Sequence, residues 1–333
     1  MAEIVLGMGS SHSPMLGSPA EDYQAHADID QGKTDWKRSL VDVEGNPRSF
    51  EELVKMAPPG LAAQLEMDVL KERAARCQDC IAHLAKTIED AALDALIVIG
   101  DDQHEQFMED NMPSVIVYWG ETIENTVLQL SEESPEWWKR ARSQYHENEG
   151  RRQYPVAHEL GRHLIGYLVE HDFDVSHSRR LPRERGEGHA FGFVHRRLMG
   201  DRVIPILPIA MNTYFPPNQP TPRRCQALGA AIRDAVRAWP EDSRIGVIAS
   251  GGLSHFTVNE ALDRAVLDAC RSKNSAALAA IPENRLRTGS SEIRNWIAVA
   301  AASDHLDVTW SDYIPCYRSL AGTGMGMGFA IWS

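Results

Sequence analysis

The apolar segment Ala95-Leu-Ile-Val-Ile99 runs directly into the polar segment Gly100-Asp-Asp-Gln-His-Glu105. A continuous apolar run rich in β-branched residues, without polar alternation, predicts a strand that is covered on both faces. The abrupt change to glycine and charged residues marks the end of that strand. In open sheets of this kind, ligands bind beyond the carboxyl ends of the strands. Gly100–Glu105 is therefore the first place to look for functional side chains.

Similar apolar runs and amphipathic helical patterns alternate along the rest of the chain. The other predicted strands are Ile4–Met8, Val115–Tyr118, Val203–Ile209 and Ile245–Ala249. The predicted helices are Glu66–Ala92, Val156–His171, Arg223–Trp239, Glu260–Ile281 and Ser291–Ala302. This alternation predicts an α/β fold with a mostly parallel or mixed central sheet flanked by helices.

Two long polar excursions, Ser18–Gly60 and Thr122–Tyr154, interrupt the alternation. The first contains one predicted short helix near Phe50–Met56. The chain has no internal repeat and no linker long enough to separate two domains, so we expect a single domain over residues 1–333, enlarged by insertions at about 18–60 and 122–154. We expect these insertions to supply a lid and subunit contacts, and the protein to be a homo-oligomer.

Composition narrows the class of protein. The 333 residues include 34 basic and 47 acidic side chains, which gives a formal charge of −13. This balance argues against binding to nucleic acid or to an anionic membrane. The chain has five cysteines, no basic leader at its start and no apolar run of the roughly 18 residues that a membrane span requires. We therefore expect a cytoplasmic location.

Several histidines lie where strands end or begin, so the fold can bring them into one crevice. They are His12 in Gly9-Ser-Ser-His-Ser-Pro14, His104 in Gly100–Glu105, His255 in Ser250-Gly-Gly-Leu-Ser-His255, and His189 in Glu187–Phe193. A single histidine after a strand is usually an ordinary loop residue, whereas several at strand ends favour a shared site. His195 is expected to lie in a solvated turn because Arg196 and Arg197 follow it.

Two imidazoles and one carboxylate that leave coordination positions open suit a non-haem iron(II) site that handles oxygen. The candidate carboxylates are Glu260 and Glu292, each near the start of a predicted helix, where the helix dipole would also favour an acid. Asp101 and Asp102 are alternative ligands, although we prefer them as residues that shape the loop or orient a ligand histidine. The glycine-rich tail Gly322–Gly328 opens no helix and is interpreted as close backbone packing rather than as a nucleotide-binding loop.

The order of these motifs resembles the class III extradiol ring-cleavage dioxygenases, of the type of the protocatechuate 4,5-dioxygenase catalytic subunit and the gallate and 3-O-methylgallate dioxygenases. The resemblance runs from residue 4 to about residue 300. It implies an iron(II) ion held by His12, His104 and Glu292, with manganese(II) as the alternative metal and O2 as co-substrate. It also implies that His255 is the catalytic acid and base.

The resemblance is incomplete at the second histidine. Relatives often carry an Asn-Asp-His turn where this chain has Asp101-Asp-Gln-His104, and a register shifted by one would place Gln103 at the ligand position. Glu260 stays the rival of Glu292. The remaining candidates for substrate binding or for support of the ligands are His189, Asp102, Gln103 and Ser291.

The function implied is O2-dependent cleavage of a catecholic aromatic acid in aromatic-compound degradation. The alternatives are a zinc-type metal-dependent hydrolase, because histidine and glutamate also make zinc sites, and a non-catalytic binding protein on the same scaffold. An anionic substrate needs a local cation, for which Arg294 is a candidate. The expected partner is the small aromatic substrate, with no nucleic acid and no membrane.

Overall fold

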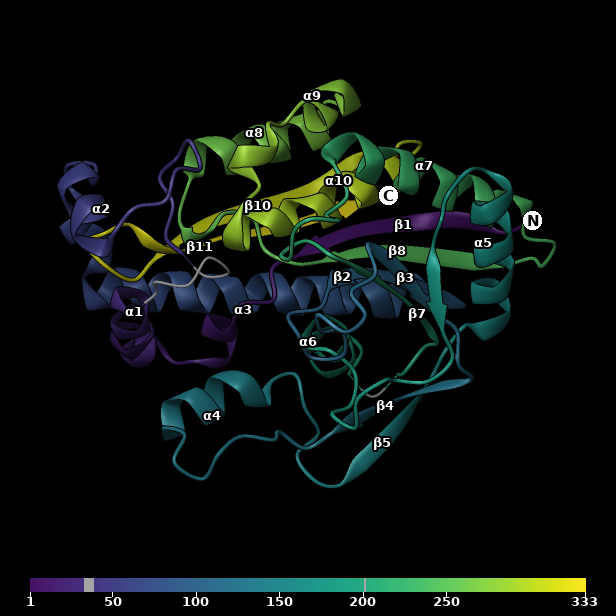
Figure 1. Ribbon diagram of the computed structural model, residues 1–333, viewed down its shortest axis with the longest axis horizontal. Helices are drawn as coiled ribbons and strands as arrows, with labels where there is room; N and C mark the ends of the chain where they lie inside the picture. The colour runs from purple at the N-terminus through teal and green to yellow at the C-terminus, as the bar shows by residue number, and fades with distance from the viewer. Residues whose placement is uncertain (33–38, 201) are drawn as a thin grey trace.

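Strand β2 (Ala95–Asp101) lies inside a mixed sheet in the computed structural model, which describes residues 1–32, 39–200 and 202–333 (Figure 1). The sheet runs in the order β10 (Val308–Tyr317), β11 (Thr323–Trp332), β1 (Glu3–Ser10), β8 (Arg244–Ser250), β2, β7 (Ile206–Met211), β3 (Val115–Tyr118) and β6 (Ser176–Ser178), and β9 (His255–Thr257) pairs with β11. Strands β1, β8, β2 and β7 are parallel to one another. Their carboxyl ends therefore meet at one edge.

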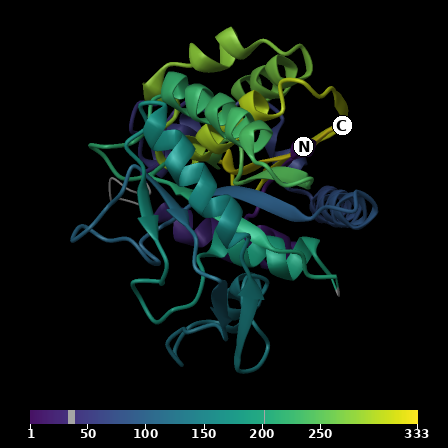
Figure 2. The ribbon, with the colours of Figure 1, turned by 90° about the vertical axis from the view of Figure 1, so that its right-hand side faces the viewer.

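Helices cover both faces of this sheet, as Figures 1 and 2 show. The helices α5 (His158–Glu170), α7 (Pro222–Ala238) and α10 (Ile293–Ala302) share a core with Ile97 and Ile99 of β2. The long helix α3 (Met67–Asp90) shares the opposite core with Leu96 and Val98. Successive residues of β2 thus enter different cores, which explains the continuous apolar run. The predicted α/β class with a mixed sheet flanked by helices is confirmed, and each predicted strand corresponds to one strand of the sheet.

Helix α10 packs unusually close to β1 because the strand carries glycine at the contact. A Cβ atom at Gly9 would lie 2.5 Å from the ring of Trp296. The indole Nε1 of Trp296 donates a hydrogen bond to the carbonyl oxygen of Gly251, at 2.9 Å. These contacts fix the start of α10, and with it Glu292, beside the carboxyl ends of β1 and β8.

One predicted helix divides into two in the structure. Residues Glu260–Ile281 form α8 (Glu260–Arg271) and α9 (Ser275–Ala279). Lys273 takes a left-handed backbone (φ 52°), and the side chain of Asn274 caps α9 by accepting from the amide of Ala277. The amphipathic pattern of residues 260–281 does not reveal this break, because α8 and α9 both bury their apolar side chains on the same side.

The glycine-rich tail belongs to β11, in the middle of which a Cβ at Gly326 would lie 1.9 Å from Oδ2 of Asp263. Close backbone packing, the interpretation made from the sequence, is therefore confirmed. The strands β10 and β11 themselves were not predicted. In β11, glycine at alternate positions hides the apolar pattern of a strand, and in β10 Ser311, Asp312 and Pro315 interrupt it.

Both polar excursions contain regular structure. The first includes α1 (Tyr23–Gln31) and the predicted short helix α2 (Phe50–Met56), which begins with a capping box of Ser49 and Glu52; its residues 33–38 lie outside the described residues. The second holds the hairpin of β4 (Thr122–Thr126) and β5 (Arg151–Pro155) and, between these strands, α4 (Glu136–Ser143). None of the helices in the described ranges has the length and apolar character needed to cross a membrane.

The contact of Gly9 with Trp296 yields a test of the fold. We expect Gly9→Ala to lower the free energy of unfolding by about 1–3 kcal/mol, because the added methyl group overpacks the β1–α10 contact. Urea denaturation followed by circular dichroism measures the change. The matched control is Gly166→Ala on α5, where a Cβ meets nothing within 4 Å. An unchanged stability in Gly9→Ala would show that α10 is not held against β1 in this way.

Candidate metal site and active-site cavity

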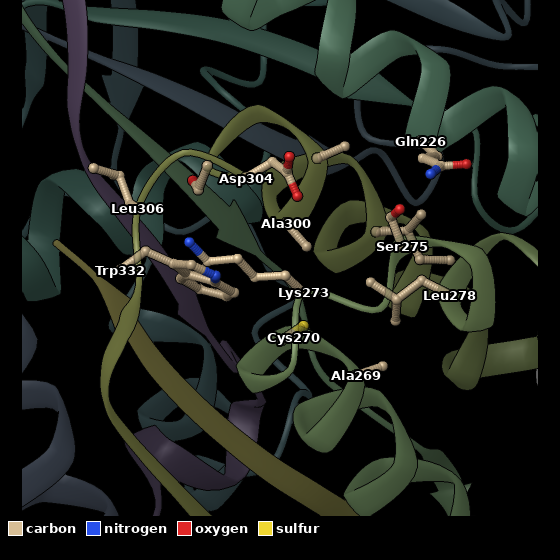
Figure 3. Close-up of a pocket in the computed structure, with 13 residues that line it drawn as sticks. Gln226, Ala269, Cys270, Lys273, Ser275, Leu278, Ala300, Asp304, Leu306 and Trp332 are labelled. Atoms are coloured by element: carbon tan, nitrogen blue, oxygen red, sulfur yellow. The ribbon is translucent and has the colours of Figure 1, made fainter.

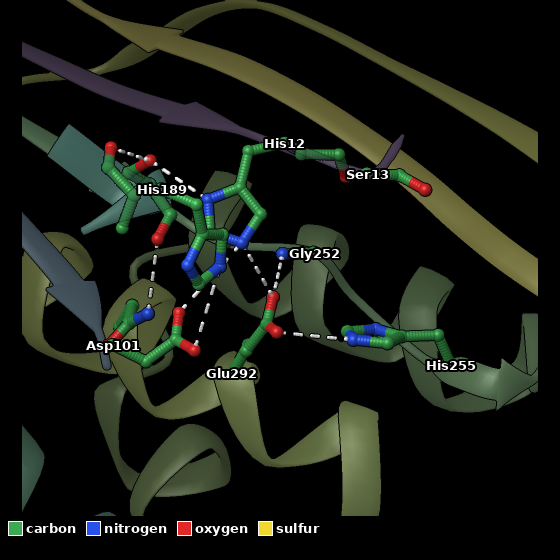
Figure 4. Close-up of polar contacts among 12 residues, drawn as sticks. His12, Ser13, Asp101, His189, Gly252, His255 and Glu292 are labelled. Atoms are coloured by element: carbon green, nitrogen blue, oxygen red, sulfur yellow. Dashed lines mark hydrogen bonds and ion pairs between the residues drawn. The ribbon is translucent and has the colours of Figure 1, made fainter. Parts of the chain in front are cut away.

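Three parallel strands deliver polar residues to one point at the carboxyl edge of the sheet. Ser10 of β1 pairs with Ser250 of β8, so the loops that follow these strands leave the sheet side by side. His12 lies in the first of these loops, and Asp101 is the last residue of the adjacent β2. Figure 4 shows their side chains meeting those of His189 and Glu292.

His12 is buried. A hydrogen bond holds its Nδ1, whereas its Nε2 is available to a ligand. The hydroxyl of Ser250 donates to the carbonyl of Ala190 (2.7 Å), so its oxygen accepts from Nδ1–H of His12 (3.1 Å). This arrangement leaves a lone pair on Nε2. Nε2 lies 3.4 Å from Oε2 of Glu292 and 3.8 Å from Oδ1 of Asp101.

His12, Asp101 and His189 form a buried group whose candidate ligand atoms lie within 4.8 Å of one another. Within the described ranges, Nε2 of His12 and Oδ1 of Asp101 have no hydrogen-bond partner. Buried polar atoms are normally satisfied, so these two atoms need an explanation. Imidazole nitrogen and carboxylate oxygen are common ligands of divalent transition metals, and this group could hold such an ion.

His189 is oriented by a carboxylate on its far side. Its Nδ1 lies 2.7 Å from Oε2 of Glu105, whose oxygens also accept from the backbone amide of His189. Burial alone would lower the pKa of His189, but Glu105 raises it above its ordinary value. Burial alone would raise the pKa of Glu105, but His189 lowers it to about 2. With Nδ1 engaged in this way, Nε2 of His189 points toward Asp101 and the rest of the group.

Glu292, at the start of α10, accepts hydrogen bonds from several directions. Oε2 accepts from the amide of Gly252 at 2.6 Å, and Oε1 accepts from the hydroxyl of Tyr214 at 2.7 Å. Burial alone would raise the pKa of Glu292, but His255 and His12 lower it well below its usual range. Burial and the nearby Glu292 raise the pKa of Asp101 well above its usual range. Two buried carboxylates around His12 favour a bound cation.

His255 lies on the other side of Glu292 (Figure 4). Its Nδ1 donates to the carbonyl of Leu253 at 3.0 Å, because a carbonyl can only accept. Its Nε2 lies 3.0 Å from the hydroxyl of Tyr214 and 3.1 Å from Oε1 of Glu292. In the neutral ring, Nε2 is consequently the nitrogen that can take up a proton.

Some side chains of the loop Asp101–Glu105 face the candidate ligands, and others point away from them. The amide of Gln103 lies among the group, with Nε2 3.2 Å from Oδ2 of Asp101 and 3.3 Å from Oε1 of Glu292. The carboxylate of Asp102 accepts hydrogen bonds from the backbone amides of Glu105, Gln106 and Phe107. Burial raises the pKa of Asp102 to about 7. His104, by contrast, stacks on Phe215 with ring centroids 3.8 Å apart. The structure thus brings Gln103, and not His104, next to the other candidates.

Four other residues that the sequence drew attention to lie outside the buried group of His12, Asp101 and His189. They are Glu260, Ser291, His195 and Arg294. The carboxylate of Glu260 contacts Tyr317 and Arg264 instead of a histidine of the site. Ser291 is buried one residue before Glu292, although the side chain that contacts the backbone of His255 belongs to Ser290. His195 is buried with Nδ1 2.8 Å from Glu187, so the expected solvated turn is wrong. The guanidinium of Arg294 donates to backbone carbonyls in the core.

A cavity of about 350 Å³ opens over the group, a size in the range of small-molecule sites. His12, Gln103, His189, Tyr214, His255 and Glu292 line its inner end. A separate cavity between α8 and α10, lined by residues that include Cys270, Lys273 and Trp332, measures only about 10 Å³ (Figure 3). That space admits about one water molecule. Of these two cavities, only the one over the histidines has room for an aromatic ring.

Sequence patterns do not single out two residues of the site, Tyr214 and Glu105. Tyr214 follows the end of β7 by three residues, so the rule that ligands bind beyond parallel strands would have pointed to it. Glu105 lies in the loop that follows β2, but its partner His189 is 84 residues away. No spacing in the sequence relates the two.

The comparisons with known proteins agree with this geometry. Residues 66–326 match the family described as the catalytic LigB subunit of aromatic ring-opening dioxygenase. The chain belongs to this family.

Individual relatives match the LigB-family chain over shorter segments. A gallate dioxygenase of Pseudomonas putida is 36% identical over 98 residues, which are 29% of this chain and 28% of the relative. A 2,3-dihydroxyphenylpropionate/2,3-dihydroxicinnamic acid 1,2-dioxygenase of Comamonas testosteroni is 28% identical over 177 residues, 53% of this chain and 47% of the relative. The match thus spans less than half the length of either relative.

The contact of Glu105 with His189 yields a test of the candidate metal site. We expect Glu105→Gln to weaken binding of a divalent metal by roughly 10- to 100-fold, because the ring of His189 loses the carboxylate that orients it. Titration of the metal-free protein with Mn(II), followed by electron paramagnetic resonance, measures the affinity. Glu109→Gln is the control, since that exposed carboxylate lies near His104. Equal affinities in both variants would contradict a role of His189 in metal binding.

Proposed function

We propose that the protein is a non-haem iron(II)-dependent extradiol dioxygenase that cleaves the ring of a catecholic aromatic acid with O2, as part of aromatic-compound degradation. The observation that carries the proposal is the buried group of two imidazoles and two carboxylates at the inner end of a ring-sized cavity, with a further histidine, His255, beside it. Membership in the LigB family and the ring-cleaving activities after which the relatives are named support it.

The residues present fit a divalent metal. His12 and His189 would supply imidazole nitrogens, and Asp101 and Glu292 would supply carboxylate oxygens on either side of His12. The buried, unsatisfied atoms of His12 and Asp101 support this assignment. When bound, iron(II) would supply Lewis acidity toward the catechol oxygens and a redox partner for O2; manganese(II) is the alternative ion.

His255 supplies the proton transfer. The carbonyl of Leu253 holds the proton on Nδ1, so Nε2 of the neutral ring can accept the proton of a catechol hydroxyl in the cavity. The imidazolium that forms then faces Oε1 of Glu292 at 3.1 Å, and this carboxylate stabilises its charge. The hydroxyl of Tyr214 contacts both groups and orients them. The same proton is available for return to the substrate when the ring opens.

The backbone around the site keeps these groups in place. The hydroxyl of Tyr145 donates to the carbonyl of His12 at 2.5 Å, and Ser290 accepts from the backbone amide of His255 at 3.3 Å. The side chains of His12, Asp101 and Glu292 are almost fully buried. Preorganised groups in a water-excluded site need little rearrangement during the reaction.

The direct test of the function is oxygen consumption. The protein is loaded with Fe(II) under anaerobic conditions and mixed with protocatechuate, gallate, 3-O-methylgallate or catechol, and O2 is then admitted. We expect O2 uptake in equal amount to the ring-opened product of at least one of these compounds, with both oxygen atoms of 18O2 in that product. A zinc-type hydrolase would consume no O2, and a binding protein would release the compounds unchanged.

A pair of variants separates proton transfer from metal binding. We expect His255→Ala to keep its affinity for Mn(II) while kcat falls by roughly 10²- to 10⁴-fold, the usual contribution of a general acid or base. We expect Glu292→Gln to lose metal affinity, because a buried negative charge beside His12 disappears. His83→Ala, at an exposed position of α3, is the control. Near-normal turnover by His255→Ala would contradict the proposed role of His255 in proton transfer.

We further propose a cytoplasmic location, a homo-oligomeric state, and the absence of nucleic-acid or membrane partners. All five cysteines are buried free thiols, which supports a reducing compartment. The formal charge of −13 disfavours polyanionic partners. Light scattering coupled to size-exclusion chromatography tests the oligomeric state.

A further inference from the structure

The more exposed part of the cavity lining comes mainly from the two polar excursions, and the lining includes two arginines. The described residues that line it there include Ile29 of α1, Trp138 and Arg142 of α4, and Arg318. Glu292 also lines the cavity, and the buried carboxylate of Asp101 lies 3.8 Å from Nε2 of the lining residue His12. An anionic substrate can enter such a cavity only if its negative group faces away from these carboxylates and toward a cation.

The two arginines of the outer wall differ in what they bind. The guanidinium of Arg318 holds both oxygens of Asp30, through Nε at 2.6 Å and Nη2 at 2.8 Å. That pair is buried, so the charge of Arg318 is already balanced. Arg318 therefore has little capacity left for a substrate.

Arg142 makes no such bidentate pair. The nearest carboxylate oxygen, Oε1 of Glu105, lies 3.7 Å from its Nη2, and Glu105 is already engaged by His189. Nε of Arg142 is buried and has no hydrogen-bond partner within the described part of the chain. The guanidinium carbon lies 5.8 Å from the ring of Trp138 and 5.6 Å from that of Tyr145, and these contacts hold the side chain at the cavity.

We propose that Arg142 binds the carboxylate of the substrate and thereby selects catechols that carry an acidic substituent; the proposal rests on the ring cleavage proposed above. The side chain of Arg142 is 26% exposed where it lines the cavity, and a planar guanidinium can make two parallel hydrogen bonds with a carboxylate. The same cavity then takes the two hydroxyl groups of the catechol at its inner end, near His12 and His255. The metal site thus binds the hydroxyl end of the substrate and Arg142 binds its carboxylate end, which fixes the orientation of the substrate.

The proposal also gives the second excursion a function. Arg142 and Trp138 belong to α4, and Tyr145 follows that helix directly. The hydroxyl of Tyr145 donates to the carbonyl of His12. The excursion thereby contributes both to the support of the metal site and to the recognition of the substrate.

The test compares a charged and an uncharged substrate in matched variants. In Arg142→Gln, we expect kcat/KM for protocatechuate to fall by roughly 10- to 100-fold, mainly through KM, because a charge-assisted hydrogen bond is lost. We expect the value for 4-methylcatechol, which has no carboxylate, to change little. Arg142→Lys keeps the charge but not the planar geometry, and it should recover part of the loss. Arg140→Gln is the control, since that side chain on the same helix pairs with Asp22.

A binding measurement keeps the two proposals apart. Protocatechuate is titrated anaerobically into metal-loaded protein, and its dissociation constant is compared between the natural protein and Arg142→Gln. Weaker binding in the variant supports the role of Arg142 even if no O2 is consumed, a result that would refute only the ring cleavage. Equal losses for both catechols, or no loss for protocatechuate, would overturn the assignment of Arg142.

Discussion

The buried carboxylate of Glu292 is the interaction on which the rest of the site depends. A charge that is removed from water must be paired or hydrogen-bonded, and here the partners come from separate parts of the chain. The amide of Gly252, the hydroxyl of Tyr214 and the rings of His12 and His255 all lie within 3.4 Å of its oxygens. Moving any of these segments would leave the charge unsatisfied. The close contact of Gly9 with Trp296, which fixes the start of α10, is thus also a condition for the site.

Much of the fold could be predicted because burial on both faces leaves a plain signal in the sequence. The run Ala95–Ile99 is continuous because its residues enter two cores in turn. The strand β11 has no such run, since close packing there requires glycine where apolar side chains would stand, and in β10 polar residues and Pro315 interrupt the run. The break between α8 and α9 was hidden for a similar reason, as both helices bury the same side.

The site was harder to predict than the fold. His12, His255 and Glu292 were expected near one another, and the structure brings them together. The loop after β2 could not be resolved from the sequence, because a shift of one residue changes which side chain points inward. Asp101 and Gln103 face the other candidates, whereas His104, at a left-handed backbone position (φ 64°), stacks on Phe215. Contacts such as Glu105 with His189, or Arg142 with the cavity, join distant segments and leave no pattern in the sequence.

We propose that one divalent metal binds at the carboxyl edge of the sheet, among His12, Asp101, His189 and Glu292. The most direct measurement is an anomalous difference map from crystals of the protein grown with Mn(II) or, anaerobically, Fe(II). We expect one strong peak within coordination distance of Nε2 of His12, with ligands from His189 and at least one of the two carboxylates. A peak at His104, or no peak near His12 in crystals that contain the metal, would contradict it.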